Sequence, residues 1–166
     1  MNEVGAAMRL EDYRPGALGR ICEMQASEYA LSLGFGRDFE VRVAGDMAAF
    51  LGRFEPDRDL FKIALQDDDI VGSVALDVSA RSDGWAHLRW FFVADCHRGH
   101  GLGGHLLRTA LDHAHHVGGR GVYLWTVDGL PAARHLYVKS GFRLTQSELG
   151  DSWGREIVEQ RFELSL

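Results

Sequence analysis

Glycines and one arginine follow directly after a strongly apolar segment, and this combination could bind a phosphate group. The apolar segment ends at Val93. Glycine leaves backbone N–H groups uncovered, and arginine adds a fixed positive charge beside them. A helix that begins here would present its unpaired first N–H groups, at the positive end of its dipole, to an anion. The sequence therefore predicts a pyrophosphate-binding turn made of Arg98, Gly99, His100, Gly101, Leu102, Gly103 and Gly104.

The spacing of these residues fits two kinds of nucleotide-binding protein. Arg98, Gly101 and Gly103 match R/Q-x-x-G-x-G/A, the coenzyme A signature of the GNAT superfamily of N-acetyltransferases, which the chain resembles here. The glycines also match the dinucleotide fingerprint G-x-G-x-x-G, with Asp128 near the place of a ribose-binding acid. That motif normally follows its strand at once and lies early in the chain, so the coenzyme A interpretation is preferred. A glycine-rich helix start without any ligand is the structural alternative.

The elements that must hold this turn follow from the periodicity of the apolar residues. Alternation predicts strands, a spacing of three to four predicts helices, and Gly, Pro and Asp clusters mark turns. The second helix is expected to bury Val41, Val43 and Met47. In chain order, we expect a strand at 8–13, helices at 17–34 and 39–54, strands at 60–65, 70–78 and 85–93, a helix at 102–118, a strand at 122–127, a helix at 131–140, and strands at 142–147 and 157–164.

This order, β-α-α-β-β-β-α-β-α-β-β, resembles the GNAT fold over essentially the whole chain. The resemblance implies an α/β fold with about four helices and a mixed, mostly antiparallel sheet that contains one splayed parallel strand pair. Strands 85–93 and 122–127, joined through a helix, are expected to be that pair. The motifs Y-R-P-G-x-L-G and A-A-R-x-L-Y-x-x-x-G-F are similar to the acetyltransferase half of bacterial MarR–GNAT fusion proteins. The DNA-binding half has no counterpart in the sequence, so no regulator function is carried over.

The resemblance to GNAT enzymes also implies how acetyl-CoA would be bound. Its pantetheine arm would enter the gap between the splayed strands. Main-chain groups of Phe91 and Val93 would hydrogen-bond to this arm and to the thioester, while residues 98–104 hold the pyrophosphate. A backbone amide near Phe91 or Phe92 would polarise the thioester carbonyl and stabilise the oxyanion.

Two residues are candidates for proton transfer. Tyr137 stands in the motif A-x-x-L-Y-x-x-x-G-F, whose tyrosine commonly protonates the leaving thiolate in the family. The attacking amine needs a base, because an alkylammonium of pKa ~10.4 is neutral in only about one molecule in a few thousand at pH 7. His87 occupies the position where family members often carry a carboxylate, and its chemistry suits proton transfer near neutral pH. Strand alternation places His87, Arg89 and Phe91 on one face. The structural alternatives are a packed tyrosine and a half-exposed strand histidine.

Three charged residues are candidates for contact with the acceptor. Arg89 could bind a substrate carboxylate through two hydrogen bonds, or could form a structural ion pair. Glu28 and Glu40, on the two predicted N-terminal helices, could act as a base through water. Leu130 stands where the family often has an asparagine that contacts the coenzyme.

Composition limits the classes of partner. The 166 residues carry a formal net charge of −6, which disfavours nucleic acid or an anionic membrane and favours a cationic amine. A single domain over residues 1–166 and a cytoplasmic location are expected, since no apolar run approaches the ~20 residues of a membrane span. Two cysteines do not make a disulfide framework, and neither the histidines nor the acidic run at 67–69 has metal-ligand spacing, so no metal is expected. A homodimer is left open.

Taken together, these features predict an enzyme that transfers the acetyl group of acetyl-CoA to a primary amine. The acceptor would be a small or amino-acid-like molecule that attacks directly in a ternary complex. Two alternatives remain from the same residues. One is an acyl-CoA-binding sensor or regulatory module with little catalysis, and the other is a protein N-acetyltransferase.

Overall fold

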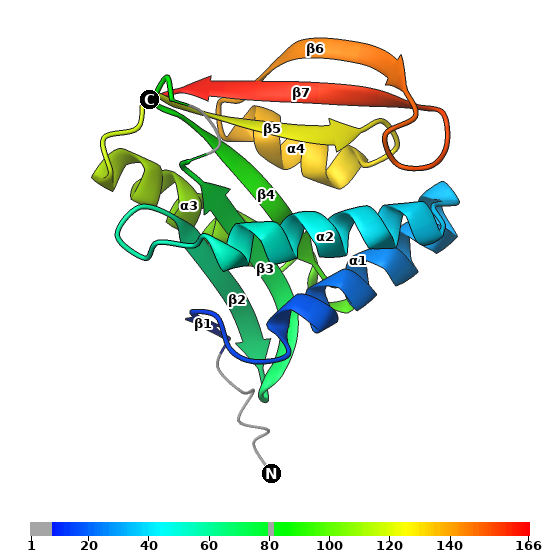
Figure 1. Cartoon of the computed structure of the whole chain (residues 1–166), viewed down its shortest axis with the longest axis horizontal. Coiled ribbons are helices and arrows are strands. Elements are labelled where there is room, and N and C mark those ends of the chain that lie inside the picture. Colours follow the sequence, from blue (N-terminus) through cyan, green and yellow to red (C-terminus); the bar gives the residue numbers. More distant parts are fainter. Residues whose placement is uncertain (1–7, 80–81) are drawn as a thin grey trace.

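One mixed sheet organises the chain, and helices cover both of its faces (Figure 1). The computed structural model describes residues 8–79 and 82–166. The strand order across the sheet is β1-β2-β3-β4-β5-β7-β6. The α/β class and the predicted order of elements are confirmed. The elements are β1 (Arg9–Glu11), α1 (Ala17–Leu33), α2 (Arg37–Gly52), β2 (Leu60–Gln66), β3 (Asp69–Asp77), β4 (Trp85–Val93), the short 3-10 turn η1 (Asp95–His97), α3 (Leu102–His116), β5 (Gly121–Val127), α4 (Pro131–Lys139), β6 (Arg143–Gly150) and β7 (Ile157–Ser165).

The helices divide the core between the two faces of the sheet. Helices α1 and α2 pack on one face, whereas α3 and Tyr137 of α4 pack on the other. In α3 a single stripe of apolar residues is buried, as the three-to-four spacing predicts. In α2 the buried residues are Phe39, Val43, Met47 and Phe50. Val41 is 63% exposed, so its predicted burial is wrong.

Strands β4 and β5 are parallel at one end and separate toward the other. They pair only at Trp85–Gly121, Ala86–Val122 and His87–Tyr123. Beyond these positions β4 runs downward across Figure 1 while β5 continues along the top of the molecule. The predicted splayed parallel pair is therefore confirmed, and residues 88–93 of β4 have no strand paired to the edge that faces β5.

A β-bulge interrupts β4 at Trp90. The register with β3 shifts between Ser73 and Ala75, and Trp90 adopts a φ of 44°. The extra residue reverses the alternation of the strand. Leu88 packs on the α3 side of the sheet, whereas Trp90 and Phe92 both pack on the α1–α2 side.

The bulge corrects one prediction from strand alternation. His87, Arg89 and Phe91 were expected on the same face. Phe91 instead packs with the α3 side of the core, while Arg89 reaches Asp46 of α2 on the opposite face. The ring of Phe91 and the charge of Arg89 therefore lie on different sides of the sheet.

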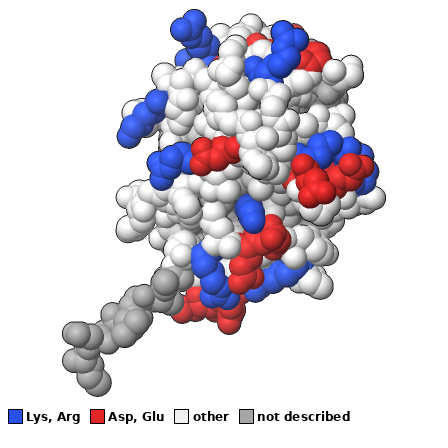
Figure 2. Space-filling model, turned by 90° about the vertical axis from the view of Figure 1, so that its left-hand side faces the viewer, with Lys and Arg blue, Asp and Glu red and all other residues white. Residues whose placement is uncertain are grey.

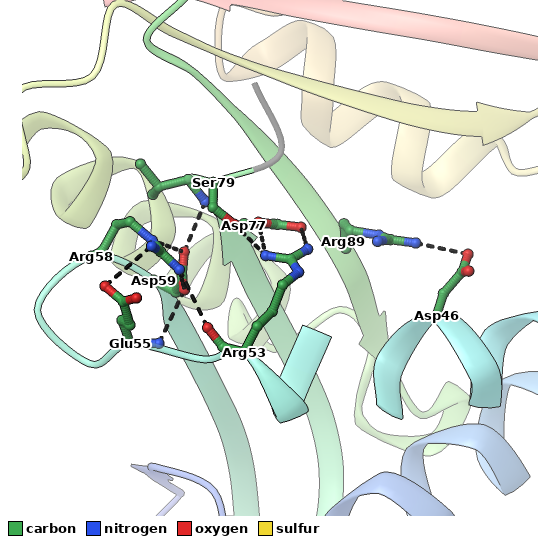
Figure 3. Close-up of polar contacts among 9 residues, drawn as sticks. Asp46, Arg53, Glu55, Arg58, Asp59, Asp77, Ser79 and Arg89 are labelled. Atoms are coloured by element: carbon green, nitrogen blue, oxygen red, sulfur yellow. Dashed lines mark hydrogen bonds and ion pairs between the residues drawn. The ribbon is translucent and has the colours of Figure 1, made fainter. Parts of the chain in front are cut away.

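A buried carboxylate fastens the segment between α2 and β2 to the sheet (Figure 3). Asp59 is only 1% exposed and accepts hydrogen bonds from the backbone N–H groups of Glu55 (3.2 Å) and Val78 (3.1 Å). It also forms an ion pair with Arg58 at 2.8 Å. Because the two N–H groups come from different segments, Asp59 joins the end of α2 to the end of β3.

Asp77, the last residue of β3, forms a second clasp in the same region (Figure 3). Arg53 donates hydrogen bonds to both of its carboxylate oxygens, one of them at 2.9 Å. Burial raises the pKa of Asp77, but hydrogen bonds from Arg53 and Ser79 and the charges of Arg53 and Arg89 outweigh it, so the pKa lies below its ordinary value. This ion pair holds the C-terminal end of α2 against the sheet.

We expect Asp59→Ala to lower the free energy of unfolding by about 3 kcal/mol, because it leaves a guanidinium and two amide donors without their acceptor. Urea denaturation followed by circular dichroism measures the change. Asp57→Ala is the matched control, since Asp57 is exposed in the same loop, and its effect should stay within about 0.5 kcal/mol. Equal losses in the two variants would contradict a structural role for Asp59.

Candidate active site

A cavity of about 380 Å³ lies where β4 and β5 separate. Its walls come from both strands, from α1, α2 and α4, and from the end of β6, the start of β7 and the loop between them. The aromatic residues of the wall are Tyr29, Phe35, Phe39, Trp90, Phe91, Trp125, Tyr137 and Trp153. The ionisable groups other than tyrosine are Arg42, Asp46, His87, Arg89, Glu148 and Glu159.

Helical spacing explains how the helices contribute to this wall. Phe39, Arg42, Val43 and Asp46 of α2 recur at intervals that keep them on one stripe of the helix. Residues 25 and 29 of α1, and residues 133 and 137 of α4, are likewise one turn apart. Each helix therefore turns one face toward the cavity.

The bulged strand directs main-chain groups at the cavity edge. Ala94 donates its N–H to Val71 of β3 at 2.8 Å, and Trp90 accepts a 2.7 Å hydrogen bond from the Ser73 hydroxyl. In a strand, the main-chain N–H and C=O groups of alternate residues point toward the same neighbouring strand. The main-chain groups of Phe92 therefore also point toward β3, whereas those of Phe91 and Val93 point toward the open edge. Main-chain groups of these two residues are thus placed where β4 has no partner strand.

The glycine turn presents backbone to the same side of the molecule. Gly99 and Gly101 have φ values of 79° and 84°, which favour glycine, and a Cβ at either position would meet nothing within 4 Å. Gly101 precedes α3 and no side chain caps the helix. A Cβ on Gly103 would lie 3.2 Å from Leu136 and 3.6 Å from Phe91, in the narrow space between α3, α4 and β4. The first N–H groups of α3 are therefore uncapped beside an open surface, as anion binding requires.

The guanidinium of Arg98 is engaged by the protein. Its Nε donates to the carbonyl of Val93 at 2.9 Å, and its terminal nitrogens pair with Glu28 and, at 3.3 Å, with Asp95. Arg98 thereby ties the glycine turn to β4 and α1. Glu28 is committed to this ion pair and Glu40 is exposed on α2, so neither candidate acceptor-site glutamate lines the cavity.

Tyr137 reaches the cavity from α4. It is 5% exposed and its ring packs against Phe91, Phe142 and Phe162 at centroid distances of 5.8, 6.0 and 5.8 Å. Burial, followed by the proximity of Tyr29, raises the pKa of Tyr137 above its ordinary value. The hydroxyl is therefore protonated at neutral pH and able to donate a proton.

His87 lies in the cavity wall at the point where the strands part. Its ring stacks on Tyr123 with centroids 4.5 Å apart and an interplanar angle of 13°. Burial, and then the charges of Arg89 and Arg161, lower the pKa of His87 to about 3, although Asp77 acts in the opposite direction. The imidazole is neutral at physiological pH and is a weak proton acceptor, which weighs against its predicted role as the base.

Arg89 forms an ion pair with Asp46 of α2 at 2.9 Å (Figure 3), and its guanidinium lies 4.3 Å from the ring centroid of Trp90. Arg42, one turn before Asp46, donates to the carbonyl of Ser152 at 2.7 Å and stacks over Trp153. Of the two roles considered for Arg89, this geometry favours the structural ion pair. Sequence reasoning missed Asp46, Trp153 and the other wall residues of α2, β6 and β7, since no local motif marks them.

Other surface features bear on the partner classes. Basic and acidic side chains are interspersed on the face shown in Figure 2. Within residues 8–79 and 82–166, no helix is long and apolar enough to cross a membrane, and no group of three or more His, Cys, Asp or Glu side chains could hold a metal ion. His113, one of the three histidines near the end of α3, contacts the carbonyl of Arg58 at 3.0 Å instead.

The splayed strand pair, the bulge and the uncapped glycine turn define an α/β protein in which an open strand edge lies beside a candidate anion-binding helix start. Residues 31–142 match the model of the Acetyltransferase (GNAT) family. Because this match spans more than half of the 166 residues, the chain belongs to the GNAT acetyltransferase family.

Individual relatives agree with this assignment. "Probable N-acetyltransferase 14" of Xenopus tropicalis is 33% identical over 104 residues, which are 62% of this chain and 48% of that protein, so the chain spans about half the length of this relative. Among solved structures, a GNAT acetyltransferase from Staphylococcus aureus superimposes with a TM-score of 0.78 at 20% identity, covering 96% of this chain and 99% of the other. A candidate acetyltransferase from Salmonella typhimurium, solved with its cofactor acetyl-CoA, gives 0.76 at 19% identity, covering 96% and 94%.

The lowered pKa of His87 leads to a test of its charge state in the folded protein. Between about pH 4 and 6 the unfolded chain binds a proton at this residue and the folded protein does not, so stability should rise with pH there. His87→Phe keeps an aromatic ring on Tyr123 and removes the titration. We expect the slope of unfolding free energy against pH to fall by about 1.4 kcal/mol per pH unit, measured by urea denaturation at several pH values. Parallel curves for the two proteins would contradict a neutral His87 in the folded protein.

Proposed function

We propose that the protein is an acetyl-CoA-dependent N-acetyltransferase that acetylates a primary amine of a small molecule by direct attack in a ternary complex. The observation that carries this proposal is the cavity at the parting of β4 and β5, because it lies beside both the unpaired edge of β4 and the hydroxyl of Tyr137. A thioester bound along that edge would face the same cavity that an acceptor amine enters.

The residues around the glycine turn fit acetyl-CoA. The uncapped start of α3 and the open surface at Gly99 and Gly101 would receive the pyrophosphate. Phe91 and Val93 would offer main-chain hydrogen bonds to the pantetheine arm, taking the place of a missing strand. When bound, the thioester supplies an activated acetyl group. Arg98 would act chiefly by holding the turn in place, since its guanidinium already contacts Val93 and Glu28.

The chain's own residues would then move charge and protons. An N–H at the β4 bulge, near Phe91, would donate to the thioester oxygen as negative charge develops on it. Tyr137 would protonate the departing thiolate, and its raised pKa keeps that proton available. Because His87 is a weak base, we propose that the acceptor reacts as its minor neutral form and that the proton leaves through water.

Several finer features of the proposal rest on sequence. We propose that, within the family, the chain is most similar to the acetyltransferase half of MarR–GNAT fusion proteins, and that it works in the cytoplasm. A sensor with little catalysis is the second candidate, motivated by Leu130, which lines the cavity where the family often has asparagine. Thiol release from acetyl-CoA with a panel of amines separates the two, because a sensor would bind the coenzyme without amine-stimulated release.

Tyr137→Phe should lower kcat by about 100-fold with little change in the Kd for acetyl-CoA, because it removes a proton donor and keeps the buried ring. Initial rates of thiol release and calorimetric titration with acetyl-CoA measure the two quantities. Tyr13→Phe, which removes a hydroxyl from a tyrosine that is 49% exposed, is the control and should behave as the unaltered protein. Unchanged kcat in Tyr137→Phe would exclude it as the proton donor.

Gly103→Leu should weaken acetyl-CoA binding by more than about tenfold, because the new side chain would occupy the space between α3, Leu136 and Phe91. Calorimetry measures the Kd, and thermal melting shows whether the variant folds. Gly45→Leu is the matched control, since a Cβ on Gly45 of α2 meets nothing within 4 Å. A folded Gly103→Leu protein with unaltered affinity would place the coenzyme elsewhere.

A further inference from the structure

Two glutamates lie side by side at one end of the cavity. Glu148 of β6 and Glu159 of β7 are directly opposite each other in the antiparallel register, and both line the cavity wall. Like charges at directly opposite positions of neighbouring strands repel each other. Among the described residues, neither glutamate has a basic side chain within ion-pairing distance. A cation between them would remove this repulsion.

Two arginines near this pair are engaged by other partners. Arg161, two residues after Glu159 on the same face of β7, forms an ion pair with Glu163 at 2.7 Å and stacks over Tyr123 at 4.5 Å. The Arg42 guanidinium is occupied by Ser152 and Trp153. The glutamate pair is therefore not neutralised from within.

Glu159 is also held in its position. The N–H of Ser152 donates to its carboxylate at 3.1 Å, and the carboxylate packs so closely on Gly150 that a Cβ there would lie 2.7 Å from its carboxyl carbon. Glu148 accepts a hydrogen bond from Gln146 at 2.9 Å. These contacts restrain both carboxylates, of which that of Glu159 is half-buried and that of Glu148 is exposed.

The inner part of the same cavity independently indicates a polar ligand. Gln25 and Tyr137 line it, are each 5% exposed, and make no side-chain hydrogen bond with any other described residue. Buried polar groups are normally paired, so unpaired ones in a cavity wall are expected to bind something that enters. The cavity thus offers neutral polar groups at the acyl-transfer end and two negative charges at the other.

The separation of these ends constrains the ligand. Glu159 lies opposite Val127, four residues beyond Tyr123, where the strands still pair. At ~3.3 Å per residue this is about 13 Å along β5. The nitrogen that attacks must be neutral, so a cation held by the glutamates has to be a second group of the same molecule. Trp125, also in the wall, provides an aromatic ring suited to a cation.

We propose that the acceptor is a primary amine that carries a second, cationic group, and that Glu148 and Glu159 bind this second charge. The inference rests on the proposed acetyl transfer and names its substrate class. It makes the glutamate pair a specificity determinant that acts on KM, because the pair lies away from the reacting atoms.

The test compares matched amines as acceptors. Decylamine, 1,4-diaminobutane and 1,10-diaminodecane differ in the presence and spacing of the second ammonium, and thiol release from acetyl-CoA gives kcat and KM for each. Because only the long diamine can span the distance between the two ends of the cavity, 1,10-diaminodecane should exceed both other amines in kcat/KM by about tenfold or more. The double variant Glu148→Gln, Glu159→Gln should lose this preference mainly through a higher KM for 1,10-diaminodecane. Glu156→Gln, the same change of charge at an exposed position of the neighbouring loop, should retain it.

Two further measurements separate the outcomes. The double variant should melt at the same or a higher temperature, because glutamine removes the repulsion, whereas a lower melting temperature would indicate a structural role and overturn the proposal. Titration of 1,10-diaminodecane into the protein by calorimetry reports binding without turnover. Binding that is lost in the double variant, with no thiol released for any amine, would support the cation site and contradict acetyl transfer. Equal use of decylamine and 1,10-diaminodecane, or a preference that survives the double variant, would overturn the inference.

Discussion

The separation of β4 from β5 is the constraint on which the rest of the site depends. The two strands share three paired positions and then part, which leaves one edge of β4 without a strand. A strand normally pairs both edges or protects the free one. Here the bulge at Trp90 twists β4 away, and the Ser73 hydroxyl holds the Trp90 carbonyl on the β3 side. A φ of 44° is unfavourable for tryptophan. We infer that the bent strand has a function that outweighs this conformational cost.

The surrounding contacts keep this opening from collapsing. Phe50 of α2 packs on Trp90 with ring centroids 5.4 Å apart, and the guanidinium of Arg89 lies 4.3 Å from the centroid of the same ring. Asp46 connects Arg89 to α2, and Arg42 connects α2 to the loop between β6 and β7. A continuous set of contacts therefore runs from the bulge to Trp153 at the far side of the cavity. Since each step involves an ion pair or a ring contact, the two ends of the cavity are held at a defined separation.

Local patterns were sufficient for most of the fold and for the glycine turn. The stripe of α3, the glycines before it and the parallel pair joined by it are all encoded within about 40 consecutive residues. The bulge was not predictable, because Trp90, Phe91 and Phe92 are all large and apolar and any alternation fits them. The bulge reverses the alternation of side chains along β4 and so places Phe91 and Arg89 on opposite faces of the sheet. The predicted burial of Val41 was wrong for a simpler reason. Val41 lies two residues from both Phe39 and Val43, on the opposite side of the helix.

The acidic residues of the site could not be identified from the sequence alone. The predicted strand at 142–147 stopped before Glu148, so the cross-strand pair depends on a register that forms between segments with no shared local pattern. In the described chain, Asp46, Asp59 and Asp77 each meet an arginine, and their charges are used to fasten α2. Glu148 and Glu159 meet none, although Arg161 is only two residues away from Glu159 and is directed elsewhere. Asp59 and Asp77 are buried and each meets an arginine, whereas the exposed Glu148 and the half-buried Glu159 line the cavity without a basic partner among the described residues, so their charges remain available to a ligand.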